Sequence, residues 1–205
     1  MGRAAPAGSA GSACEAFDGA TVLEAAMNCF WARGFESTSV RDLAEEMGIT
    51  GTSLYNAFGD KRSLYRRALA YYLETSVRDR VSRLEQLPPF QAIHAFFDEV
   101  IERSITDKQR RGCMLVNAAL ELAPYDVEIH NVVSQEMVFI ETFFRRCIAA
   151  GQQHGTISPA RPSAELAKLL LSVLLGIRVL ARTRSQRTVL AGAASGVLEL
   201  LKTST

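Results

Sequence analysis

Apolar residues recur every three or four positions along most of the chain, and this spacing predicts amphipathic helices. In residues 18–33 the apolar side chains fall on one helical face, and they are Leu23, Ala26, Met27, Phe30 and Trp31. Asp18 is suited to begin this helix, and Gly34 is suited to end it. No segment alternates apolar and polar residues as a half-buried strand does. We therefore expect an all-α protein of about nine helices.

Two short helices joined by a tight turn are expected next. The first covers residues 39–47, where Ser39 and Asp42 are spaced as in a capping box. The second covers residues 51–57, and the hydroxyl of Thr50 can cap its first turn. A fourth helix is expected from about residue 61 to beyond residue 77. It buries one side, formed by Tyr65, Leu69, Tyr72 and Leu73.

The rest of the chain predicts longer helices, separated by charged or proline-containing loops. These helices are expected at residues 88–106, 113–122, 126–153, 163–182 and 188–201. Residues 1–16 are rich in Gly, Ala, Ser and Pro, which favours a disordered tail. We therefore divide the chain into this tail (1–16), an N-terminal domain (17–72) and a C-terminal domain (73–205).

Ala44, Gly48 and Leu54 have the spacing and chemistry that a helix-turn-helix requires. Ala44 is small where a second helix must cross closely, and Gly48 can take the positive φ of a tight turn. Leu54 then anchors the second helix in the core. The opposite side of residues 51–57 faces outward and carries hydroxyl and amide side chains. Such a surface can enter a DNA groove and bond base edges and phosphates.

These segments resemble the DNA-binding domain of the TetR/AcrR family of bacterial repressors. The resemblance covers about residues 17–72 and includes TSVRDLAEEMGI (38–49) and SLYNAFGDK (53–61). The segment RGCMLVNAALELAP (111–124) is also similar to the regulatory domain of one subgroup. Gly51 stands where the family often carries a basic or bulkier residue, a departure that bears on the operator sequence.

The resemblance implies an all-helical homodimer, with an N-terminal three-helix helix-turn-helix domain and a C-terminal helical domain for ligand binding and dimerisation. Each protomer would place the helix at 51–57 in the major groove. By position in the family motif, the DNA-contacting residues are Thr38, Ser39, Arg41, Thr50, Gly51, Thr52, Ser53, Tyr55, Asn56 and Lys61. We expect Tyr55 and Lys61 at phosphates, and Thr52, Ser53 and Asn56 nearer to bases. In the alternative for Tyr55, its ring packs against the first helix.

The net charge of +1 gives no general preference for a polyanion, so phosphate binding must depend on where the charges lie. Arg41 lies near the start of the second helix, and Lys61 lies in the first turn of the fourth. The dipole at a helix N-terminus disfavours a cation. A phosphate bound beside Lys61 would offset this effect.

A pocket for a small-molecule effector is expected among the apolar helices of residues 73–205, because ligand pockets combine apolar walls with a few polar groups. The candidate residues are Phe97, Ile101, Cys113, Asn117, Glu121, His130, Phe143 and Arg178. The alternative for the apolar members is an ordinary core position. The alternative for the polar members is hydrogen bonding within the fold or across a dimer.

The four cysteines form no CxxC pair, and the three histidines do not lie at metal-ligand spacing from them, so no metal and no other cofactor is expected. Cys113 follows Arg110 and Arg111, and nearby positive charge can lower the pKa of a thiol. A redox- or electrophile-sensing thiol is one interpretation, and a small buried apolar residue is the other. No pairing of residues typical of an active site is found, so an enzyme is not expected.

The apolar segment 163–182 and the segment 188–201, which is rich in small residues, suit a homodimer interface. We find no secretory signal and no apolar run near the ~20 residues that span a bilayer, so we expect a cytoplasmic protein without a membrane partner. The resemblance implies a bacterial protein that is associated with the nucleoid when bound to DNA. The function that fits is a ligand-responsive repressor, released from a pseudo-palindromic double-stranded DNA operator by a small molecule. The alternatives are an activator with the same DNA-binding head, or an all-helical small-molecule-binding protein or enzyme.

Overall fold

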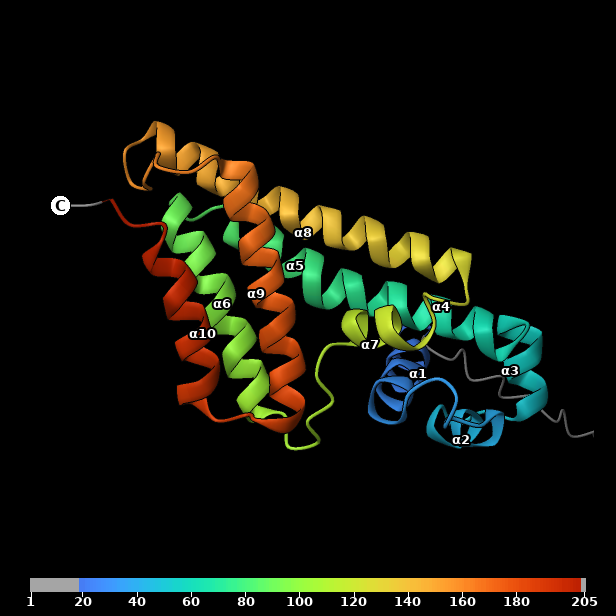
Figure 1. Ribbon diagram of the computed structural model, residues 1–205. Coiled ribbons are helices and arrows are strands. Elements are labelled where there is room, and N and C mark those ends of the chain that lie inside the picture. The colour runs from blue at the N-terminus through green and yellow to red at the C-terminus, as the bar shows by residue number, and fades with distance from the viewer. Residues whose placement is uncertain (1–18, 204–205) are drawn as a thin grey trace, which may run out of the picture.

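The computed structural model describes residues 19–203, and each regular element within them is helical (Figure 1). The elements are α1 (Gly19–Arg33), α2 (Val40–Glu46), α3 (Gly51–Phe58), α4 (Lys61–Tyr72), the π-helix η1 (Leu73–Arg78), α5 (Asp79–Leu84), α6 (Pro89–Thr106), α7 (Met114–Glu121), α8 (Val127–Gln153), α9 (Ser163–Thr183) and α10 (Arg187–Glu199). Because α4, η1 and α5 follow without a break, the described residues form nine uninterrupted helical segments. The expected all-α fold is confirmed. Asp18 and the expected tail at 1–16 lie outside the described residues.

The helices α1, α2 and α3 lie at one end of the molecule, beside α4 (Figure 1). The buried ring of Tyr65, on α4, meets the rings of Phe30 and Phe35 edge-on, with centroids 5.1 and 5.3 Å apart. Edge-to-face aromatic pairs add to the stabilisation that burial already provides. This cluster therefore holds the turn between α1 and α2 against α4.

The fourth expected helix ends at Leu84, in agreement with the predicted end beyond residue 77, but its hydrogen bonding changes in the middle. It begins at Lys61 as expected, becomes a π-helix at Leu73–Arg78, and then continues as α5 to Leu84. π-Helical turns are rare and are frequent at functional sites. The apolar periodicity alone did not predict this change, because the buried residues continue through the π-helix with nearly helical spacing.

The other end of the molecule is a helical bundle formed by α6, α8, α9 and α10 (Figure 1). Its core contains four phenylalanines, from α6 and α8, with neighbouring ring centroids 5.1 to 5.8 Å apart: Phe96, Phe97, Phe143 and Phe144. The short helix α7 packs against α4, α8 and α9. It therefore lies where the bundle meets the N-terminal helices.

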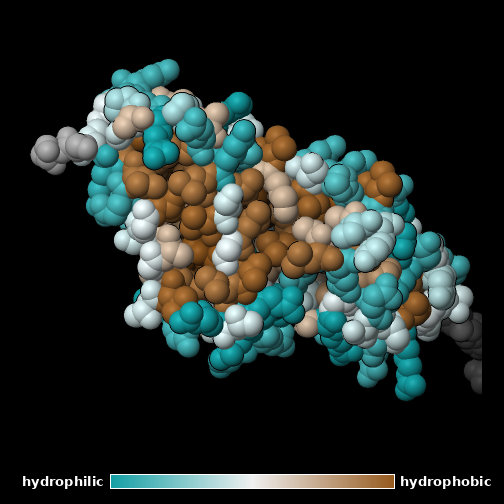
Figure 2. Space-filling model, viewed as in Figure 1, coloured by the Kyte–Doolittle hydropathy of each residue, from teal (hydrophilic) through white to brown (hydrophobic). Residues whose placement is uncertain are grey.

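Hydrophobic residues gather on the face of the bundle that Figure 2 shows, over α9 and its neighbours. One face of α9 carries the exposed residues Leu169 and Val179, and the small residues Ser172 and Gly176 between them are also exposed. On α10, Gly192, Gly196 and Leu200 are also exposed. No helix within residues 19–203 is both long enough and apolar enough to cross a membrane.

Candidate nucleic-acid interface

The turn between α2 and α3 is built by local hydrogen bonds that the sequence encodes. The Ser39 hydroxyl accepts from the Asp42 amide, and the Asp42 carboxylate accepts from the Ser39 amide at 2.8 Å, so the expected capping box is present. Gly48 has a φ of +65°, and the Thr50 hydroxyl accepts from the Ser53 amide at 3.1 Å. The capping box fixes the start of α2, whereas Gly48 and the cap at Thr50 shape the turn and the start of α3, so α2 fixes the direction of α3.

The buried side of α3 is narrow and rests on Leu54, which is fully buried. Its opposite side presents small polar residues to solvent: Thr52, Ser53, Tyr55 and Asn56 are exposed, and Gly51 is half-buried. Tyr55 is 52% exposed, so its ring does not pack into the core as the alternative proposed. The outward face of α3 thus offers hydroxyl and amide groups together, without a charged residue.

The structure corrects the prediction for Thr38. Its side chain is fully buried, and its hydroxyl donates to the carbonyl oxygen of Gly34 at 2.6 Å. Its amide donates to the carbonyl of Phe35. Both polar groups of Thr38 are therefore used to shape the turn between α1 and α2, and this side chain is not available to DNA.

The start of α4 also differs from expectation. The Asp60 carboxylate accepts from the Ser63 amide at 2.6 Å and caps the helix, and this hydrogen bond lowers the pKa of Asp60. The half-buried Lys61 places its ammonium 4.3 Å from the centroid of the Phe35 ring. The Asp60 carboxylate and the Phe35 ring thus already offset the unfavourable interaction between the Lys61 cation and the helix dipole. The exposed Arg41 has no such partner among the interactions described for residues 19–203.

Side-chain contacts tie this N-terminal end to α7 and to the segment that precedes it. The Glu121 carboxylate, at the end of α7, accepts from the backbone amide of Glu36 at 3.0 Å. Arg111, just before α7, donates to Asn28 at 3.1 Å and lies 4.0 Å from the Trp31 ring centroid. Movements of α7 would therefore act directly on α1 and on the turn that follows it.

The residues predicted for a ligand pocket do not form one group. Phe97 and Phe143 belong to the core, Ile101 is buried on α6, and His130 is exposed on α8. Asn117 donates to the Arg111 carbonyl and accepts from Arg182. Glu121 contacts the turn after α1 instead of a pocket. These residues were grouped because each lies on the apolar side of an amphipathic helix. In the fold, however, each helix turns that side toward a different neighbouring helix, so the residues do not meet.

Cys113 and Arg178 are brought together, at a small cavity of about 30 Å³. Tyr72 and Arg80 line the same cavity, with walls that include Phe96, Leu115 and Leu174. The periodicity marked Tyr72 only as a core residue, and the sequence carried no signal for Arg80. Their convergence depends on the packing of α4, α5, α7 and α9.

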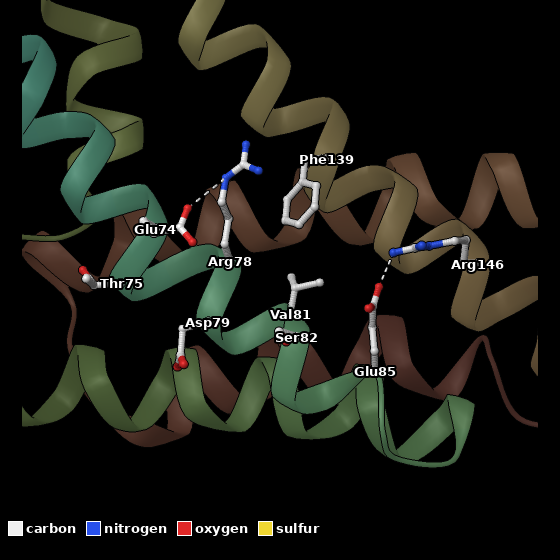
Figure 3. A pocket seen from close by; sticks show the side chains of 9 residues that line it. All are labelled: Glu74, Thr75, Arg78, Asp79, Val81, Ser82, Glu85, Phe139 and Arg146. Atoms are coloured by element: carbon white, nitrogen blue, oxygen red, sulfur yellow. Dashed lines mark hydrogen bonds and ion pairs between the residues drawn. The ribbon is translucent and has the colours of Figure 1, made fainter.

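A larger groove, of about 810 Å³, lies between η1, α5 and α8, and Figure 3 shows the side chains that line it. Its charged groups form ion pairs within the protein, some with each other and some with residues outside the groove, such as Glu136. Glu85 pairs with Arg146, and the Arg78 guanidinium lies 4.8 Å from the Phe139 ring centroid and 3.9 Å from the Glu74 carboxylate. The groove has the size of a small-molecule site, but a charged ligand would have to displace these internal pairs.

Comparison with known proteins accounts for both ends of the molecule. Residues 22–68 match the model of bacterial regulatory proteins of the tetR family, and residues 89–197 match the tetracyclin repressor-like C-terminal domain. The chain is 30% identical over 143 residues to YezE of Bacillus subtilis (strain 168), an uncharacterized HTH-type transcriptional regulator; this covers 69% of this chain and 74% of YezE. It is 27% identical over 168 residues to the HTH-type transcriptional repressor ComR of Escherichia coli (strain K12), covering 81% of this chain and 80% of ComR.

A solved structure gives a similar result over nearly the full chain. It is a cysteine mutant of the TetR family transcriptional regulator CifR in complex with a 26-base-pair operator DNA. It is 34% identical to this chain, covers 90% of this chain and 97% of its own, and superposes with a TM-score of 0.79. The chain therefore belongs to the TetR family of bacterial regulatory proteins, and it is a DNA-binding transcriptional regulator.

Proposed function

We propose that the protein is a homodimeric repressor that binds a pseudo-palindromic operator through α3 and leaves it when its regulatory half receives a chemical signal. The observation that carries this proposal is the outward face of α3. Thr52, Ser53 and Asn56 are exposed there while Leu54 holds the helix from beneath. A helix with short polar side chains can approach the base edges of the major groove closely.

Within this interface, the proposed contacts fall into two groups. Thr52, Ser53 and Asn56 lie nearest the bases, and a backbone free of bulk at Gly51 lets the helix enter the groove. The residues nearest the phosphates are Ser39, Arg41, Thr50, Tyr55 and Lys61. Phosphate contacts release counterions, so the affinity should fall steeply with salt.

The exposed apolar face of α9 and α10 supports the second part of the proposal, the dimer. The exposed Val179 and Leu169 lie on either side of Gly176 and Ser172 along α9, where small side chains allow two helices to approach closely. When two protomers pack these faces together around a two-fold axis, the apolar surface of each protomer is buried. Two α3 helices related by this symmetry would read two half-sites about one DNA turn, ~34–36 Å, apart or somewhat more.

The contacts of α7 support the third part, which is release. Glu121 and Arg111 link this helix to the turn after α1 and to α1 itself. A signal that favours a displaced α7 would change the position of the two α3 helices relative to each other. The coupling required is about 1–3 kcal/mol, which is within the range of a few displaced hydrogen bonds.

The direct test is selection of bound fragments from a random pool of double-stranded DNA by the full-length protein. We expect enrichment of one motif with two-fold symmetry. Enrichment of an asymmetric motif would contradict the proposal that a two-fold dimer binds the operator. Failure to enrich any motif would contradict sequence-specific binding. Repeating the selection at higher salt provides a control, because the motif should persist while the yield falls.

A further inference from the structure

The cavity beside Cys113 collects hydrogen-bond donors around one sulfur atom. The Tyr72 hydroxyl, from α4, donates to the Cys113 Sγ at 3.5 Å. The guanidinium of Arg178, from α9, interacts electrostatically with the same sulfur and also donates to the Tyr72 hydroxyl at 3.4 Å. Cys113 is 8% exposed and Arg178 is 6% exposed. The thiol therefore lies in a buried, positively charged environment.

The charge of Arg178 has no carboxylate partner among the residues that the structure describes. Its other acceptors are the Ser104 hydroxyl at 3.0 Å and the Gly112 carbonyl at 2.9 Å, and both are neutral. A buried charge is strongly disfavoured unless an opposite charge lies beside it. Within the lining of this cavity, the group able to supply a negative charge at ordinary pH is the thiolate of Cys113.

The three cysteines of the described residues have different environments. Burial alone would raise the pKa of the Cys113 thiol, but the positive charge of Arg178 and the hydrogen bond from Tyr72 outweigh it, so this pKa lies below the ordinary value. Burial raises the pKa of Cys29, and it raises that of Cys147 to about 11. The cation at Cys113 is thus Arg178, from the far end of the sequence. Neighbouring Arg111 is instead paired with Asp107.

The size of the cavity restricts what can reach the sulfur. Its volume of about 30 Å³ holds one or two water-sized groups, since a single water needs roughly 10–15 Å³ on the same measure. The apolar part of its wall includes Phe96, Val100, Leu115, Val116, Ile140 and Leu174. An uncharged reagent with two heavy atoms fits this space without displacing a wall. Hydrogen peroxide has this size and has no charge that must be desolvated.

We propose that Cys113, whose sulfur lies beside the Arg178 guanidinium and accepts a hydrogen bond from Tyr72, is an oxidation site for hydrogen peroxide and that its oxidation is the signal that releases the protein from DNA. The sulfur attacks one peroxide oxygen, an S–O bond forms and the O–O bond breaks. Sulfur is oxidised by two electrons and the peroxide is reduced. The leaving hydroxide takes a proton from solvent, so the products are Cys113 sulfenic acid and water.

Oxidation changes both the charge and the volume at this position. The neutral sulfenic acid leaves Arg178 without its counter-charge, and the added oxygen occupies the cavity. Cys113 directly precedes α7, and Arg111, two residues earlier, contacts Asn28 on α1. A displacement of Cys113 is therefore transmitted to the N-terminal helices through a short and direct connection. The release step rests on the proposed repressor function, whereas the reaction at sulfur does not.

The test measures sulfenic acid formation at each cysteine of the reduced full-length protein. Hydrogen peroxide is added at neutral pH and is then removed with catalase. The protein is next unfolded in urea that contains dimedone, so that the trap reaches the sulfenic acid at every cysteine, and the labelled peptides are quantified by mass spectrometry. Because each pKa unit changes the thiolate fraction about tenfold, we expect Cys113 to react at least about tenfold faster than Cys147 or Cys29. Cumene hydroperoxide, which is too bulky for the cavity, should label Cys113 much more slowly.

Two variants separate the reaction from the fold. Arg178→Met should slow labelling of Cys113, whereas Cys147→Ser is a matched control that should leave it unchanged. Equal labelling of the three cysteines in the wild-type protein would overturn the proposal, as would equal rates with the two peroxides. These results involve no DNA, so they are independent of the repressor function. A second experiment tests release from DNA. Peroxide should dissociate a preformed DNA complex of the wild-type protein and of Cys147→Ser, and dithiothreitol should restore it. A complex that persists while Cys113 is fully labelled would overturn the release step.

Discussion

Glu136 illustrates how a single buried carboxyl can set the pH dependence of stability. It is 2% exposed, and only one of its oxygens has a partner, the Arg78 guanidinium at 2.9 Å; the other is unpartnered among the described groups. Burial raises the pKa of this carboxyl above its ordinary value of 4.5, against the opposing effect of Arg78. The folded protein therefore holds this proton at a higher pH than the unfolded chain does.

The sign of the resulting effect follows from proton linkage. As pH rises from about 4.5 through the folded pKa, the unfolded chain releases the proton first, so this group lowers the free energy of unfolding. Glu136→Gln removes this contribution. The difference in free energy of unfolding, wild type minus variant, should therefore decrease as pH rises, as measured by urea denaturation between pH 4 and 8. Glu74→Gln is the control, since Glu74 is exposed and contacts the same Arg78; a parallel trend in both variants would contradict this account.

At the scale of elements, the helix-turn-helix formed by α2 and α3 could be predicted from the sequence because its causes are local. Ser39 and Asp42 are three residues apart, and Gly48 lies where the chain must turn. The π-helix η1 and the cluster at Cys113 could not be predicted from local sequence signals. Tyr72, Cys113 and Arg178 are far apart in sequence and meet only because α4, α7 and α9 pack together. The charge near Cys113 was expected from its neighbour Arg111, but a distant residue supplies it.

Two glycines of this turn provide a matched pair for a stability test. Gly48 has a φ of +65°, whereas Gly51 has no such constraint, and an added Cβ would meet nothing within 4 Å at either position. Gly48→Ala should therefore lower the free energy of unfolding by about 1–2 kcal/mol through backbone strain alone. Gly51→Ala should leave it unchanged or raise it by up to about 1 kcal/mol, because alanine favours a helix. Denaturant unfolding at one pH measures both, and equal effects would contradict the role assigned to Gly48.

At the scale of the whole molecule, the fold class and the DNA-binding end were predictable, but the relation between the two ends was not. Amphipathic periodicity marks which side of each helix is buried, without stating against which neighbour. Glu121 was accordingly assigned to a ligand pocket, although its carboxylate holds the amide of Glu36 in the N-terminal end. Thr38 was assigned to DNA, although its hydroxyl is used by Gly34. The backbone partner of Glu121 lies 85 residues away in sequence and only folding brings it near, whereas the partner of Thr38 lies four residues away, at the end of the preceding helix.

The proposed dimer depends on the exposed apolar face of α9, which predicts the outcome of a charge placed there. Val179 is 49% exposed on this face, and Val179→Asp would bring two carboxylates into the interface. We expect the variant to sediment as a monomer at micromolar concentration and to lose most of its DNA affinity. Val127→Asp, at a position that is 76% exposed at the start of α8, is the control and should remain a dimer. A monomeric wild type would contradict the proposal.

The central claim is that the exposed face of α3 recognises the DNA sequence. The most direct measurement is the specificity ratio, which is the affinity for the selected motif divided by the affinity for unrelated DNA. Fluorescence anisotropy at one salt concentration gives both affinities. For Asn56→Ala this ratio should fall by about tenfold or more, because a good side-chain contact to a base contributes about 1–3 kcal/mol of discrimination. Gln135→Ala, exposed on α8, should leave the ratio unchanged. An Asn56→Ala protein, and likewise a Thr52→Ala protein, with the specificity ratio of wild type would contradict the claim.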